Sequence, residues 1–266
     1  MKPTAFLKFT LALISFCVNA QESIVLPIDP AYRNAFVNIS LQSGSIEIVG
    51  HDKNEFIIDV QLDSLKTETK TTKNKNGFMR LGNNAFDIDI TNSENRLDIK
   101  SYSSKGLKKL VINVPSSSDM SIVTNKGNLV VDAVHGKLDV TSNYGKIDIK
   151  GINGSVVASC PNGNVAVDFV EIDKKAPSSI TSLNGKIEVS VPKKSSVSFN
   201  LLSIEGGIYS NFDMQLTPKV KSYYKNTDNG TYTSIKKWMI GTLNKGGPSI
   251  FISTVHSDIY LKTTKD

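Results

Sequence analysis

Cysteine is nearly absent from this chain of 266 residues, which contains only Cys17 and Cys160. Cys17 lies in an N-terminal segment that we expect to be removed, so the mature chain would keep one cysteine and form no intramolecular disulfide. An exported protein without disulfides must be held together by side-chain packing and by backbone hydrogen bonds.

Catalytic and metal-binding motifs are missing as well. The three histidines are His51, His135 and His256, and none has a second histidine or cysteine nearby in the sequence, so no closed metal set is predicted. No serine stands in a nucleophile-elbow phrase. The glycines precede strand-like runs, which excludes a phosphate-binding loop. The sequence therefore predicts a protein that is not an enzyme and that needs no metal or cofactor.

Positive charge is modest. The formal net charge is +6, and it falls to +4 once Lys2 and Lys8 leave with the N-terminal segment. A dedicated nucleic-acid binder would carry a concentrated basic stripe. Nucleic acid is therefore not an expected partner.

Long apolar runs are confined to the N-terminus. Leu11 to Val18 form a short apolar stretch after two lysines, which is typical of a signal peptide over residues 1–20 with cleavage before Gln21. The alternative is lipidation of Cys17, although a lipobox prefers a small residue where Phe16 stands. No other stretch approaches the roughly 18 apolar residues of a spanning helix. We expect an exported domain over residues 21–266, located in the periplasm, on the outer surface or outside the cell.

What the chain does contain is a strict glycine period of nine residues. Each glycine opens a short alternating apolar run, and the period covers Gly127, Gly136, Gly145, Gly154 and Gly163. A fixed period of turn plus short strand is typical of a β-solenoid. We predict an all-β, single-domain β-solenoid with about 18–22 residues per coil, in which each coil stacks on the one before. Roughly eleven to thirteen coils would make a stack of about 50–60 Å.

Written in units of eighteen residues, the repeat predicts ladders of buried side chains, because alternate residues of a strand face the same side. The predicted inward ladders are Leu129, Ile147, Val165 and Ile187; Val131, Ile149, Val167 and Val189; and Val134, Ile152 and Val170. Cys160 aligns with Thr124, Ser142 and Ser182 and is predicted to be a small corner residue. The Asn-Gly dipeptides at the corners suggest glycines with positive φ.

The intervening residues alternate in charge, as in the pairs Lys146 with Asp148 and Lys186 with Glu188. The simplest interpretation is a solvated outer face. A second interpretation is a carboxylate site for cleaving acidic polysaccharides. The corners lack the aspartates of calcium-binding nonapeptide repeats, so we expect no calcium.

Two segments depart from the period. Residues 66–76 are rich in lysine, threonine and asparagine and predict a mobile loop or hairpin tip. Residues 217–247 carry Tyr223, Tyr224, Tyr232 and Trp238 among lysines and predict a hairpin or excursion from the solenoid. These aromatic side chains could contact sugar rings or a protein. The alternative is that they cap the core and cover an open sheet edge.

Several phrases resemble a large bacterial family of unknown function whose members are labelled adhesins by analogy of shape. They are the segments 37–50, 110–115, 184–189 and 246–261, and the resemblance extends over about residues 24–262. It implies a secreted or envelope-associated right-handed β-helix-like domain. We therefore expect an exported, non-enzymatic module that binds a cell-surface glycan or envelope protein. An envelope-stress sensor or scaffold with a specific protein partner is the first alternative, and a polysaccharide-active enzyme is the second.

Overall fold

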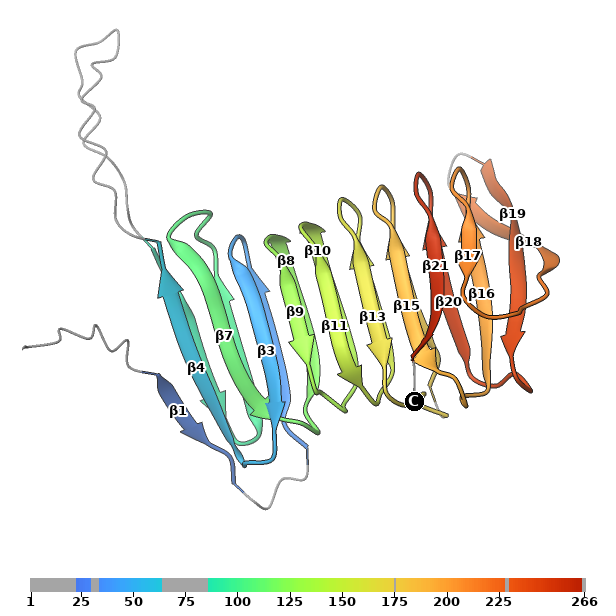
Figure 1. The fold of residues 1–266 in the computed structure, drawn as a ribbon. Coiled ribbons are helices and arrows are strands. Elements are labelled where there is room, and N and C mark those ends of the chain that lie inside the picture. Colours follow the sequence, from blue (N-terminus) through green and yellow to red (C-terminus); the bar gives the residue numbers. More distant parts are fainter. Residues whose placement is uncertain (1–22, 30–33, 64–85, 175, 228–229, 265–266) are drawn as a thin grey trace, which may run out of the picture.

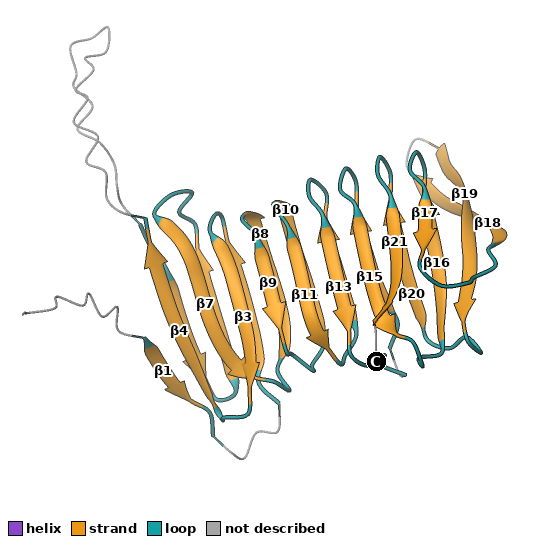
Figure 2. Ribbon diagram, viewed as in Figure 1, coloured by secondary structure: helices purple, strands orange, loops and turns teal. Residues whose placement is uncertain are grey.

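The structure, a computed structural model, describes residues 23–29, 34–63, 86–174, 176–227 and 230–264. The predicted signal peptide, including Cys17, and the predicted loop over residues 66–76 lie outside these residues. Within them every regular element is a β-strand and none is a helix (Figure 2). The prediction of an all-β chain is confirmed.

Two long sheets face each other and enclose one continuous apolar core. Sheet A, which faces the viewer in Figure 1, has the order β1 (Ile24–Pro27), β4 (Glu55–Leu62), β7 (Leu107–Pro115), β3 (Ser45–His51), β9 (Leu129–Asp132), β11 (Ile147–Ile152), β13 (Val165–Phe169), β15 (Ile187–Pro192), β21 (Ile259–Thr264), β17 (Ile208–Ser210). Sheet B lies behind it with the order β18 (Thr217–Thr227), β19 (Gly230–Leu243), β16 (Val197–Ser203), β20 (Ser249–Thr254), β14 (Ser178–Ser182), β12 (Val156–Cys160), β10 (Leu138–Tyr144), β8 (Asp119–Lys126), β2 (Phe36–Leu41), β6 (Arg96–Ser101), β5 (Asp89–Ser93). Each coil gives one strand to each sheet, as a β-solenoid requires.

The predicted ladders are formed by parallel pairing in register. Ile147 pairs with Leu129 on one side and with Val165 on the other, and all three side chains are buried. The ladder continues through Ile187 to Ile259, which lies in β21, the last strand of the sequence. β-Branched aliphatic side chains suit this pleated, fully buried surface.

One predicted core position is wrong. Val170 is 56% exposed, and Phe169 takes the buried place opposite Ile152. The register of β11 and β13 shifts after Ile149, where Gly151 adopts a φ of 64°. An extra residue in one strand changes which side chains face inward.

The order of the coils also departs from the prediction. The coils from β8 to β15 stack in sequence, but β2–β3 lies between β6–β7 and β8–β9, and β20–β21 lies between β14–β15 and β16–β17. From β2–β3 the chain passes through β4 and β5 outward to β6–β7 and then crosses β2–β3 to reach β8–β9; at the other end, the β18–β19 hairpin precedes the inward return to β20–β21. Eight strand pairs stack in the described residues, about 34 Å at the usual strand spacing. The predicted eleven to thirteen coils are therefore too many, because β1, β4, β5, β18 and β19 pair antiparallel at the ends instead. The right-handed winding stays a prediction.

The corner glycines are needed for close approach between coils. A Cβ added to Gly163 would overlap the carbonyl oxygen of Gly145, and one added to Gly185 would overlap that of Gly163. Neither Gly163 nor Gly185 has a positive φ. The prediction that these two glycines are required for a positive φ is therefore wrong. Backbones of successive coils meet here without room for a side chain.

Small polar side chains follow the same corner. Ser142 donates a hydrogen bond to the Gly127 carbonyl at 2.9 Å, and the thiol of Cys160 lies 3.3 Å from the Gly145 carbonyl. Burial raises the pKa of Cys160 to about 11. Cys160 is therefore a neutral, structural corner residue, as the alignment of the repeats predicts.

Candidate interaction surfaces

The β18–β19 hairpin extends sheet B beyond the last coil. β18 and β19 pair from Thr217 with Ile240 to Thr227 with Gly230, whereas β19 pairs with β16 only from Met239 to Leu243. Among the described residues, residues 230–238 therefore have β18 as their only strand neighbour (Figure 1, right-hand end). A two-stranded ribbon of this kind is marginally stable without further packing.

The hairpin covers a sheet edge, but Tyr223 and Tyr224 do not close the core. β19 pairs with the edge of β16, as the capping interpretation expects. The core itself is covered at this end by Phe212, Met214 and Leu216, and the Phe212 ring lies 6.1 Å from that of Phe199. Tyr223 and Tyr224 are 45% and 72% exposed.

Trp238 packs on the outside of sheet B. Its ring meets Phe251 edge to face at 6.4 Å between centroids, and the Lys221 ammonium lies 5.4 Å from the Trp238 centroid and 5.6 Å from that of Phe251. These are cation–π distances. The Nε1 atom of Trp238 is buried and has no hydrogen-bond partner among the described residues. Trp238 thus anchors the base of the hairpin and holds a lysine beside it.

The pairing register divides the hairpin into two faces, because directly opposite residues of an antiparallel pair lie on the same side. The basic face, which continues the outer side of sheet B, carries Lys219, Lys221, Tyr223 and Lys225 on β18 and Ser234, Lys236 and Trp238 on β19. The side chain of Tyr232 lies outside the described part of the chain. The apolar face carries the exposed side chains of Val220, Tyr224 and Ile235, with Lys237 beside them.

The four aromatic residues predicted as a contact site therefore do not form one cluster. The register puts Tyr223 and Trp238 on the basic face and Tyr224 on the apolar face, and the side chain of Tyr232 lies outside the described residues. Sequence alone could not separate them, because the faces depend on which residues pair across the strands.

The two strands of the hairpin carry charge of one sign. They contain five lysines and no aspartate or glutamate, and Asp228 stands between them in the sequence. In the described part of the chain, none of these lysines forms an ion pair. The strands thus form a concentrated positive surface on a chain of modest net charge.

On the outer face of sheet A, in contrast, lysines form ion pairs with carboxylates. Lys146 Nζ lies 2.9 Å from Asp148, and Glu188 is 2.6 Å from Lys262 and 3.6 Å from Lys186. The hydrogen bond from Lys262 is the main cause that holds the pKa of Glu188 below its usual range. Paired carboxylates of this kind fit a solvated outer face better than a catalytic site with a free acid and base.

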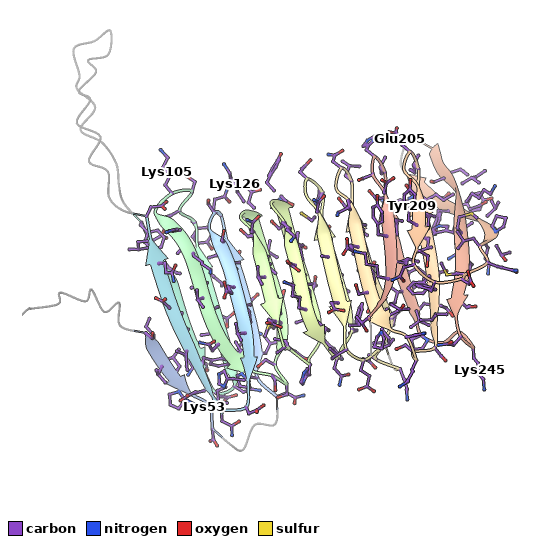
Figure 3. The ribbon with its side chains drawn as sticks, viewed as in Figure 1. Lys53, Lys105, Lys126, Glu205, Tyr209 and Lys245 are labelled. Atoms are coloured by element: carbon purple, nitrogen blue, oxygen red, sulfur yellow. The ribbon has the colours of Figure 1, made fainter. Side chains whose placement is uncertain are left out.

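Sequence reasoning missed an aromatic pair on sheet A. The rings of Tyr209 and Tyr260 stack at 5.0 Å with 15° between their planes, and the Lys186 ammonium lies 5.6 Å from the Tyr260 centroid. Tyr209, labelled in Figure 3, is 51% exposed on the last strand of the sheet. The repeated Ile-Tyr dipeptides at 208–209 and 259–260 are a signal for this pair. The sequence predicts this pair only once the order of the coils is known, because β21 and β17 become neighbours when the last coil of the sequence inserts between two earlier ones.

The histidines have local partners or are exposed. His256 Nδ1 lies 2.7 Å from Glu205, His51 Nδ1 accepts a hydrogen bond from the Lys53 amide, and His135 is exposed. No group of three or more potential ligands that could hold a metal occurs within the described ranges. Nor do those ranges include a helix long and apolar enough to cross a membrane.

Comparison with known proteins agrees with the resemblance found in the sequence. A structure described as a "putative cell adhesion protein" from Clostridium sporogenes is 14% identical, with a TM-score of 0.43, over 91% of this chain and 99% of that one. A "putative adhesin" from Bacteroides fragilis is 10% identical, with a TM-score of 0.39, over 91% and 96%. No curated protein matches the chain. The model of the Toastrack DUF4097 family matches residues 5–236, most of the sequence, and the chain belongs to this family.

Proposed function

We propose that this protein is an exported, non-enzymatic, adhesin-like module that contacts a glycan or a protein of the cell envelope through the β18–β19 hairpin. The observation that carries the proposal is the hairpin itself, which presents exposed tyrosines and unpaired lysines beyond the end of the solenoid. Export rests on the predicted signal peptide over residues 1–20, and N-terminal sequencing of the exported protein should begin at Gln21.

The solenoid supplies a firm base for this contact. The core side chains of the coils are almost completely buried, and backbone hydrogen bonds join each coil to the next. A rigid support lowers the entropy lost on binding. Tyrosine and tryptophan are favoured at interfaces because they combine a large apolar surface with a polar group.

The sensor or scaffold role remains the second candidate, and the apolar face is the observation that favours it. Val220 and Ile235 are large, exposed and diagonal neighbours across the two strands. A glycan would leave these aliphatic side chains in water, whereas a protein partner could bury them.

The test is binding of residues 21–266 to glycan arrays and to envelope fractions. We expect the double variant Trp238→Ala/Tyr224→Ala to lose binding, because it removes one aromatic side chain from each face. The matched control is Tyr102→Ala/Tyr144→Ala, which removes two exposed tyrosines elsewhere and should bind like the unaltered protein. Circular dichroism checks that both variants are folded. Absence of binding by the unaltered protein would contradict the adhesin-like role and favour a specific protein partner.

A further inference from the structure

We propose that the basic face of the hairpin binds a linear acidic glycan, a polymer of sugars that carry carboxylate, sulfate or phosphate groups. This inference rests on the function proposed above and names the ligand class of the same hairpin. It is carried by the distribution of charge and aromatic side chains over the two faces.

Like charges face each other within the free hairpin. Lys221 and Lys236 stand directly opposite each other on the basic face, and like charges at directly opposed positions destabilise a strand pair. Lys219 and Lys225 extend the same row. Neither strand carries a carboxylate, and Asp228, between the strands in the sequence, is one negative charge against five lysines. A bound polyanion would reduce this repulsion.

Lysine and aromatic side chains alternate along the basic face. Side chains on one face of a strand recur about every 6.6 Å. On β18 this row is Lys219, Lys221, Tyr223 and Lys225, so Tyr223 stands between two lysines. On β19, opposite this row, Trp238 and Lys236 again place an aromatic side chain next to a lysine, and the Lys221 ammonium lies over the Trp238 ring. An extended acidic sugar chain lying along the strands would find anion partners and stacking surfaces in turn.

Competing occupants fit the hairpin less well. An anionic lipid surface would have to bury Val220 and Ile235, but of the five lysines of the two strands only Lys237 shares their face, and the other four lie on the opposite face. Pairing with the β18 edge of a second copy would bring together two rows of lysines, and lysines on an edge strand oppose such association. A flexible polyanion needs only the basic face.

The experiment measures binding of the protein to immobilised polygalacturonate, with neutral dextran as the reference, at several salt concentrations. The test variant is Lys219→Gln/Lys221→Gln/Lys225→Gln/Lys236→Gln. The control removes the same charge far from the hairpin, as Lys105→Gln/Lys108→Gln/Lys126→Gln/Lys137→Gln; Lys105 and Lys126 lie toward the other end of the molecule (Figure 3). A further variant, Tyr223→Ala, tests stacking without changing the charge.

We expect binding to polygalacturonate but not to dextran, and affinity that falls as salt rises. The hairpin variant should bind at least tenfold more weakly, the control within about twofold of the unaltered protein, and Tyr223→Ala more weakly with the same salt dependence. Equal losses in the two lysine variants would overturn the inference in favour of general charge attraction.

Two other results would also overturn it. Binding to vesicles of phosphatidylglycerol and phosphatidylethanolamine, without binding to polygalacturonate, would assign the face to a lipid surface. Salt-independent binding to dextran or to envelope proteins, lost with the Trp238→Ala/Tyr224→Ala variant, would reject the acidic ligand while the proposed contact role survives. Loss of that role would instead be seen as no binding to any glycan or envelope fraction.

Discussion

Replacing Ile147 with aspartate should unfold the solenoid, because this side chain is completely buried between Leu129 and Val165. Removing a buried isoleucine side chain from a packed core costs about 2–5 kcal/mol. Placing a carboxyl group there without a partner adds about 2–7 kcal/mol, even if it is protonated. The sum is comparable with the whole free energy of unfolding of a typical domain, about 5–15 kcal/mol.

The neighbouring change Lys146→Asp introduces the same side chain one residue away, on the outer face. Its cost should stay within about 1 kcal/mol: it replaces an exposed ion pair with Asp148 by a second exposed carboxylate, while Lys150 still lies 3.6 Å from Asp148. Urea unfolding followed by circular dichroism compares the two variants with the unaltered protein. Similar losses of stability at positions 146 and 147 would refute the assignment of inward and outward ladders.

Three further predictions concern the corners and the charged face. Gly163→Ala should lower the free energy of unfolding by about 1–3 kcal/mol in urea titrations, because its Cβ would overlap the Gly145 carbonyl; unchanged stability would contradict the close approach. Cys160 should resist thiol reagents at pH 8 until the protein unfolds, because it is buried and its pKa is raised to about 11; rapid labelling of the native protein would contradict this. Glu188 has a lowered pKa, so its contribution to stability is present above its unfolded pKa, near 4.3, and is lost as pH falls through the folded value. Lys262→Gln should weaken this acid dependence, although Lys186 still lowers the pKa of Glu188, and the effect should stay below about 1 kcal/mol because the pair is partly exposed; an unchanged pH profile would show that the pair with Lys262 does not contribute.

The central coils could be predicted from the sequence because their information is local and periodic. The eighteen-residue spacing brings Leu129, Ile147 and Val165 into one ladder without knowledge of any distant segment. The position of Phe169 could not be predicted in the same way, since it depends on a bulge at Gly151 in the neighbouring coil.

The ends of the solenoid required information that periodicity does not contain. The return of β20–β21 between two earlier coils depends on pairing between residues as far apart as Glu188 and Tyr260. The composition of the hairpin marked the aromatic residues as candidates. Their division between two faces depends on the cross-strand register, for example the pairing of Tyr224 with Thr233.

Hydrogen–deuterium exchange of the protein, with and without the envelope fraction or glycan that it binds, shows directly whether the hairpin is the contact site. The free hairpin beyond β16 should exchange quickly, because there each of its strands pairs with one other described strand. Bound ligand should slow exchange in residues 217–243 and leave the coils from β8 to β15 unchanged. Protection confined to sheet A around Tyr209 and Tyr260, with none in the hairpin, would refute a contact through the hairpin.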